Sequence, residues 1–92
     1  MIYLEERHLK IIKEILSKYP YTFYAFGSRV LGTHKPFSDL DICAMDDIPT
    51  ITKGYLEEAF EESDLPFKID IIEWNKISKE FQTLIKKDLV EL

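Results

Sequence analysis

The sequence predicts one small α/β (α+β) domain over residues 1–92, built as a mixed sheet with helices mainly on one face. Two observations lead to this prediction. Helical periodicity alternates with short β-branched and aromatic runs, which gives the order α-β-α-β-α-β-α. In addition, 46% of the residues are hydrophobic, which is typical of a folded globule, while 92 residues leave room for a single core.

The first half of the chain predicts a helix, a strand and a short helical turn. Apolar residues recur at three- and four-residue steps over residues 3–19, and Pro20 ends that helix. Residues 21–26 are β-branched or aromatic and predict the first strand. Residues 28–31 then form one turn closed by Gly32, and a loop follows over residues 33–38.

The second half predicts two more strands, each followed by a helix. The second strand covers residues 40–45, and Thr50 is a suitable N-cap for a helix over residues 51–63. We expect that helix to bury Ile51, Tyr55, Leu56, Ala59 and Phe60. The third strand covers residues 67–72, and a last helix runs over residues 76–89 with Ile77, Phe81, Leu84 and Ile85 on one side.

A Gly-Ser pair and an Asp-x-Asp pair mark the ends of the first two strands. Gly27 and Ser28 follow the first strand, and ten residues later Asp39 and Asp41 enter the second. A Gly-Ser pair leaves backbone N–H groups and a hydroxyl free to meet phosphate. Carboxylates at i and i+2 of a strand share a face and can share a divalent cation. The pattern therefore predicts metal-dependent chemistry on a nucleoside triphosphate.

The same site constrains the topology and brings in a third carboxylate. If Ser28 and the Asp pair touch one ligand, the first two strands run antiparallel, and the third should lie parallel to the second after its helical crossover. Asp70 lies within that third strand and would then stand beside Asp41. Three carboxylates at close range repel one another unless cations are present, and two Mg²⁺ ions would satisfy them. The alternative for Asp70 is an ion pair with Lys68 on the same strand face.

Charge and composition exclude several classes of partner. The net charge is −5 and no basic run exceeds Lys86-Lys87, which argues against a long nucleic acid substrate. No apolar run approaches the roughly 20 residues of a membrane span, and Glu5-Glu6 interrupts any secretory signal. A single cysteine, Cys43, excludes an internal disulfide and fits a reducing cytoplasm.

The sequence resembles the DNA polymerase beta-type nucleotidyltransferase superfamily in three features. These are Gly27-Ser28, the pair Asp39-x-Asp41 ten residues later, and a later strand aspartate, Asp70. The short chain resembles its minimal nucleotidyltransferase branch, in which Arg29 would complete the Gly-Ser-Arg often found there. The resemblance implies the nucleotidyltransferase α/β core.

The resemblance also implies roles for the site residues. Asp39 and Asp41 would hold two Mg²⁺ ions, Gly27 and Ser28 would contact the β- and γ-phosphates of ATP, and Asp70 would ligate the ion nearest the acceptor. Minimal members are commonly encoded with a HEPN-domain ribonuclease toxin and act as its antitoxin. Some of them transfer AMP from ATP to a tyrosine of that toxin.

Several alternatives remain open at this point. The chain could be a non-catalytic antitoxin that neutralises its partner by covering it, or it could adenylylate a small molecule. Arg29 could contact a phosphate or pair with a local acid. His34 could touch nucleotide, whereas His8 fits a structural role. Exposed apolar residues near the ends of the chain, Tyr3, Val90 and Leu92, could serve the toxin contact or a homodimer.

Overall fold

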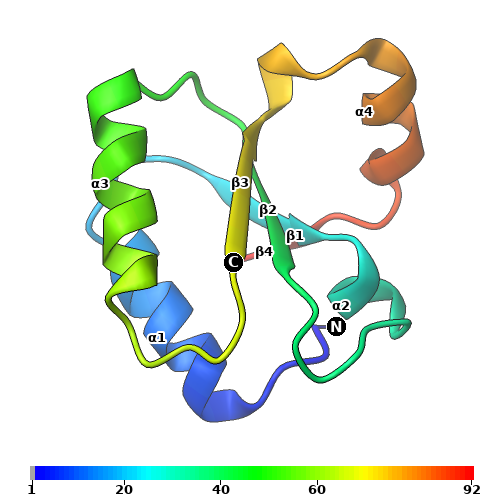
Figure 1. Cartoon of the computed structure of the whole chain (residues 1–92). Coiled ribbons are helices and arrows are strands. Elements are labelled where there is room, and N and C mark those ends of the chain that lie inside the picture. The colour runs from blue at the N-terminus through cyan, green and yellow to red at the C-terminus, as the bar shows by residue number, and fades with distance from the viewer. Residues whose placement is uncertain (1) are drawn as a thin grey trace.

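The structure is a computed structural model that describes residues 2–92. Its elements follow one another as α1 (Glu6–Leu16), β1 (Phe23–Phe26), α2 (Ser28–Leu31), β2 (Leu40–Ala44), α3 (Thr50–Glu61), β3 (Ile69–Glu73), the 3₁₀ helix η1 (Trp74–Lys76), α4 (Lys79–Lys86) and β4 (Val90–Glu91) (Figure 1). The predicted mixed α/β class is confirmed.

The four strands form one mixed sheet in the order β3-β2-β1-β4. β1 pairs antiparallel with β2 and with β4, whereas β2 pairs parallel with β3. The predicted antiparallel and parallel pairings are therefore both confirmed. Because β3 lies at one end of this order, the strand that carries Asp70 has a partner on one side only.

The main hydrophobic core lies between the sheet and the pair α1 and α3, which Figure 1 shows to the left of β2 and β3. The two helices contribute Ile12, Leu16, Leu56 and Phe60, and the strands contribute Phe23, Ala25, Leu40, Ile42, Ala44 and Ile71. The strand residues alternate along each strand, so their neighbours point to the opposite face.

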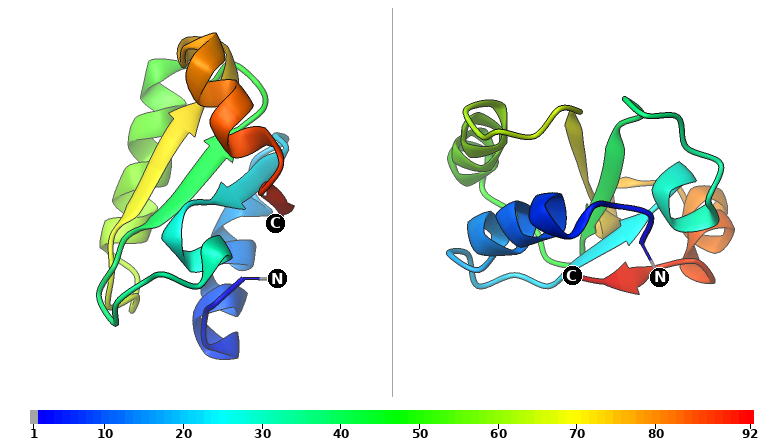
Figure 2. Two further views of the ribbon diagram at one scale, coloured as in Figure 1. Left: turned by 90° about the vertical axis from the view of Figure 1, so that its right-hand side faces the viewer. Right: turned by 90° about the horizontal axis from the view of Figure 1, so that it is seen from below.

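The opposite face of the sheet carries a smaller core beneath α4. Phe26, Cys43 and Ile85 are buried there, with Ile72 and Trp74 packed against them. Both views of Figure 2 show α4 beside the sheet on the side away from α1 and α3. The longest helices therefore share one face, and α4 covers part of the other. The uncovered remainder of that second face is where the predicted site lies.

Two predicted helices are shorter than expected, and one strand was missed. Residues 3–5 are not helical, because Tyr3 donates its N–H to the carbonyl of Arg29 and accepts from the Arg29 side chain. The last helix begins at Lys79, where Ser78 caps it by accepting from the N–H of Phe81, and ends at Lys86. The chain then forms β4 instead of continuing as helix, because Val90 and Glu91 pair with the edge of β1.

The prediction that α3 buries Ile51 and Tyr55 was wrong. They are 67% and 57% exposed, whereas Leu56 and Phe60 are buried as expected. The i, i+4 pair Leu56 and Phe60 fixes which side of α3 meets the sheet, and Ile51 and Tyr55 fall outside that stripe.

Within residues 2–92, no helix combines the length and the apolar character that crossing a bilayer requires.

Candidate nucleotide and metal site

Two of the three predicted catalytic aspartates, Asp41 and Asp70, fall in one row on adjacent strands. In the strand register, Phe26 of β1 lies opposite Asp41 of β2, and Asp41 lies beside Asp70 of β3. Residues in register on adjacent strands point to the same face, at a strand spacing of about 4.8 Å. The structure thus brings Asp41 and Asp70 together on the face of the sheet that α4 only partly covers.

Asp41 is held under electrostatic strain by its surroundings. Its pKa is raised from 3.8 to about 6, first by burial, then by the charge of Asp70, and then by that of Asp39. Asp41 is half-buried whereas Asp70 is exposed, so the cost of burial falls on Asp41. A cation bound here would relieve both burial and repulsion.

Glycine is the only residue type that fits at position 27, at the end of β1. The backbone of Gly27 has φ 84° and ψ −156°, a combination that side chains strongly disfavour. A Cβ at this position would also collide with the carboxylate of Asp41. The loop after β1 therefore passes directly against the carboxylate, with Ser28 following as the first residue of α2. This close approach of backbone to Asp41 is what a phosphate cradle next to a metal site requires.

Asp39 stands slightly apart from the other two carboxylates. It is exposed, precedes the first residue of β2 and lines a neighbouring cavity with Glu57 and Lys68. Its charge nevertheless acts on Asp41. Across residues 2–92, no three His, Cys, Asp or Glu side chains already stand close enough together to hold a metal ion. Asp41 and Asp70 are the two carboxylates that lie in register, and Asp39 lies outside that row.

The carboxylate pair opens into a cavity of about 640 Å³. One part of its lining is the site itself, Gly27, Asp41 and Asp70. The remainder comes from Phe26, Leu31, Ile72, Phe81, Leu84, Ile85, Lys87 and Asp88. A cavity of this size can hold a nucleotide, and it combines a polar end with an apolar wall.

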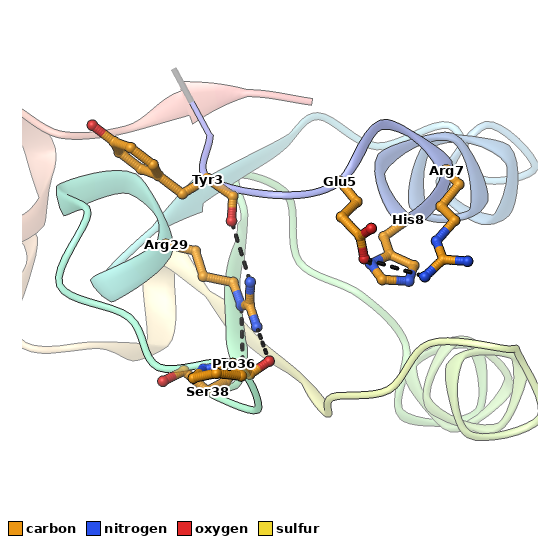
Figure 3. Close-up of polar contacts among 7 residues, drawn as sticks. All are labelled: Tyr3, Glu5, Arg7, His8, Arg29, Pro36 and Ser38. Atoms are coloured by element: carbon orange, nitrogen blue, oxygen red, sulfur yellow. Dashed lines mark hydrogen bonds and ion pairs between the residues drawn. The ribbon is translucent and has the colours of Figure 1, made fainter.

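Arg29 is placed differently from the other predicted site residues. It is buried, and its guanidinium donates to three backbone carbonyls, from Nε to Ser38 at 2.9 Å, from Nη2 to Pro36 at 3.0 Å and from Nη1 to Tyr3 at 3.2 Å (Figure 3). It also lies 4.1 Å from the centre of the Phe67 ring. No carboxylate is among these partners, so the expected pairing with a local acid is not formed, and the contact with a phosphate stays a prediction. Arg29 instead fixes the loop over residues 33–38 that leads to Asp39.

Comparison with known proteins agrees with this geometry. Residues 5–92 match the Nucleotidyltransferase domain family, and the chain belongs to that family. The predicted superfamily and the predicted class of enzyme, a nucleotidyltransferase, are thereby confirmed.

Among individual proteins, the chain is similar to the probable protein adenylyltransferase MntA of Haemophilus influenzae, strain ATCC 51907 / DSM 11121 / KW20 / Rd. The two are 40% identical over 88 residues, which cover 91% of this chain and 77% of MntA.

Two solved structures share the fold at 22% identity. A toxin–antitoxin structure with AMP-PNP superposes with a TM-score of 0.71 over 89% of this chain and 69% of that one. A toxin–antitoxin MntA-HpeT mutant superposes with a TM-score of 0.68 over 97% and 72%.

Sequence reasoning missed the contribution of α4 to the site. Phe81, Leu84 and Ile85 were expected only as the apolar side of a core helix, yet all three line the cavity that holds Asp41 and Asp70. The spacing of these three residues would be the same whether the helix packs on a core or lines a cavity, so the spacing could not distinguish the two. One signal could have indicated it. Ile72 lies on the same strand face as Asp70 and needs an apolar neighbour, so an apolar element had to pack close to Asp70.

Proposed function

We propose that this protein is a Mg²⁺-dependent adenylyltransferase that moves AMP from ATP to a hydroxyl of another protein, a tyrosine of a HEPN-type ribonuclease toxin, and thereby acts as an antitoxin. One arrangement supports the proposal most directly. Asp41 lies in register with Asp70, and the backbone of Gly27, which has no side chain, passes directly against the Asp41 carboxylate. Family membership supports nucleotidyl transfer, and the name of the 40% identical relative supports a protein acceptor.

The donor set fits magnesium. Carboxylate oxygens are the ligands that Mg²⁺ prefers, and the raised pKa of Asp41 reflects burial and negative charge that a cation would offset. We propose that Asp41 and Asp70 hold the metal, that Asp39 completes the set, and that there are two ions. Bound Mg²⁺ would neutralise phosphate charge and make the acceptor hydroxyl more acidic.

The chemistry is an in-line displacement at the α-phosphorus of ATP. The acceptor oxygen forms a bond to that phosphorus while the bond from phosphorus to the α–β bridging oxygen breaks, and pyrophosphate leaves with the bonding electron pair. The hydroxyl proton passes to Asp70, directly or through water. Gly27 and Ser28 hold the β- and γ-phosphates, so the leaving group lies on the β1 side of the row.

The acceptor is best sought on the other side of the row, beyond Asp70. β3 is an edge strand and Asp70 is exposed, so a protein can approach the α-phosphorus from there. Two of the solved structures that share this fold are toxin–antitoxin structures, and one of them contains AMP-PNP. A toxin encoded beside this chain is therefore the first acceptor to test. Cys43 as a free thiol suits action in the cytoplasm.

The proposal is tested by incubating the purified protein with α-labelled ATP, Mg²⁺ and the purified neighbouring toxin. We expect label on the toxin with the wild type, and a loss of at least about 100-fold in rate with Asp41→Asn, because the metal seat is removed. Asp64→Asn is the matched control, since Asp64 is exposed in the turn after α3 and should leave the rate unchanged. A tight unlabelled complex would instead establish the binding-only antitoxin.

A further inference from the structure

The last helix turns an apolar stripe toward the candidate site and not only toward the core. Phe81, Leu84 and Ile85 recur at i, i+3 and i+4 of α4, and all three line the cavity that holds Asp41 and Asp70. Lys87 and Asp88, just beyond the end of the helix, line it too. Ile85 is buried in the small core, but Phe81 and Leu84 remain 36% and 64% exposed. The small core therefore buries only part of this apolar stripe, and the rest of the stripe faces the cavity.

The contribution of α2 to the cavity lining has the same character. Leu31, the last residue of α2, is 56% exposed and lines the same space. Large apolar side chains left exposed around a polar centre mark a ligand site more often than a defect of packing. Phe81 is also held in place from below, since its ring meets that of Phe26 edge to face with centroids 6.0 Å apart.

We infer that Phe81 and Leu84 of α4, together with Leu31 of α2, form the subsite for the nucleoside of the bound triphosphate. This inference rests on the proposed function and adds to it the residues that hold the base and ribose. A purine is flat and largely apolar, and it packs well on aromatic and aliphatic side chains.

In-line geometry selects the nucleoside over the acceptor as the occupant. Leaving group, α-phosphorus and acceptor oxygen lie on one line, and here that line crosses the strands from Gly27 past Asp41 to Asp70. The nucleoside is an off-line substituent of the same phosphorus, so it projects to the side of this line, and the apolar lining of the cavity lies to one side of it. In that direction Ile72, two residues beyond Asp70, leads to the stripe on α4.

The test compares two probes, AMP-PNP and inorganic tripolyphosphate, each titrated with Mg²⁺ present. We expect Leu84→Ser to weaken binding of AMP-PNP about tenfold, the cost of losing an apolar stacking surface, and to leave binding of tripolyphosphate unchanged. Leu84→Met keeps the wall and should bind both probes like the wild type. Ile51→Ser on α3 is the matched control, because Ile51 is 67% exposed and lies outside the cavity.

Three results would overturn the inference. Equal loss of both probes in Leu84→Ser would make Leu84 a structural residue, and unchanged AMP-PNP binding would mean that the nucleoside lies elsewhere. If AMP-PNP binding is unchanged and only the KM for the protein acceptor rises, the wall belongs to the acceptor. Failure of the wild type to bind either probe would instead refute the proposed function itself, and this result is distinguishable from the other three.

Discussion

At Asp41, burial and two neighbouring carboxylates combine to raise the pKa from 3.8 to about 6. Between roughly pH 4 and pH 6, the folded metal-free chain therefore binds protons that the unfolded chain does not. The contribution of Asp41 to the free energy of unfolding therefore falls as pH rises through this window and stays low above it. Asp41 thus costs stability at neutral pH, which is typical of a residue kept for function.

We expect Asp41→Asn to raise the free energy of unfolding of the metal-free protein at pH 7 by about 1 kcal/mol, a discounted figure because Asp41 is only half-buried. At pH 3.5 the difference should vanish, since the wild-type side chain is then neutral too. Thermal melts in a chelator at both pH values measure this. A variant that is less stable than the wild type at pH 7 would show that Asp41 has a compensating partner.

Arg29 illustrates the opposite case, a charged residue retained for structure. Burial lowers its pKa, and three backbone carbonyls together with the ring of Phe67 satisfy its charge. A lysine ammonium is a single point and cannot reach three carbonyls that a planar guanidinium bridges. The Gly-Ser-Arg of the sequence is thus two candidate phosphate-binding positions followed by one that supports the loop before Asp39.

Arg29→Lys should lower the free energy of unfolding by about 2–4 kcal/mol, because the buried charge keeps only part of its hydrogen bonds to the three carbonyls. It should also speed chymotrypsin cleavage after Phe37, which is exposed in the loop that Arg29 holds. Arg7→Lys is the natural control, since the Arg7 side chain is 76% exposed. Equal melting temperatures for the two variants would contradict the role assigned to Arg29.

Among the elements, α3 and α2 use glycine in opposite ways. Gly54 lies within α3, where a Cβ added to it would meet nothing within 4 Å, whereas Gly32 ends α2 with φ 81° and faces the ring of Tyr3. Helical glycine costs backbone entropy, while glycine at a left-handed helix end avoids strain.

Gly54→Ala should therefore stabilise the protein by about 0.5–1 kcal/mol, and Gly32→Ala should destabilise it by about 1–2 kcal/mol. Denaturant titration of the two variants beside the wild type gives both values. The same sign for both substitutions would mean that one of the two backbone assignments is wrong.

Much of the fold follows from local patterns, and the failures occur where distant contacts decide. β1, β2 and β3 were expected within three residues of their ends, because β-branched and aromatic runs bounded by Pro20, Gly27 and Pro66 leave little freedom. β4 has two residues and exists only because β1 offers an unpaired edge. The non-helical start of the chain likewise depends on Arg29, 26 positions away from Tyr3.

For the site, sequence spacing predicted that Asp41 and Asp70 would be neighbours, and their register agrees. Their metal and catalytic roles, with those of Asp39, Gly27 and Ser28, stay predictions. The wall on α4 was not predictable, because an apolar helical stripe gives no indication of how much of it the sheet will cover.

For the molecule as a whole, the two faces of the sheet have different roles. The face under α1 and α3 holds the large core, and the face under α4 holds a small core and the cavity. A ligand on the second face then adds stability without repacking the first.

We expect Mg²⁺ with AMP-PNP at 100 times its Kd to raise the free energy of unfolding by about 2.7 kcal/mol, since only the folded chain binds it. Asp70→Asn should retain the fold but lose most of this gain, because the proposed site would then lack one of its metal ligands. A shift in melting temperature of similar size in Asp70→Asn would remove Asp70 from the site. Asp64→Asn again serves as the control that should respond like the wild type.

Cys43 sits on the same strand face as Asp41, fully buried, and burial raises the pKa of its thiol to about 11. Such a sulfur reacts with alkylating reagents only when the small core opens and exposes it. The labelling rate of Cys43 therefore measures how often that core opens. Bound nucleotide should slow the labelling of Cys43, whereas mutations on α3 that leave the second face of the sheet intact should not change the labelling rate.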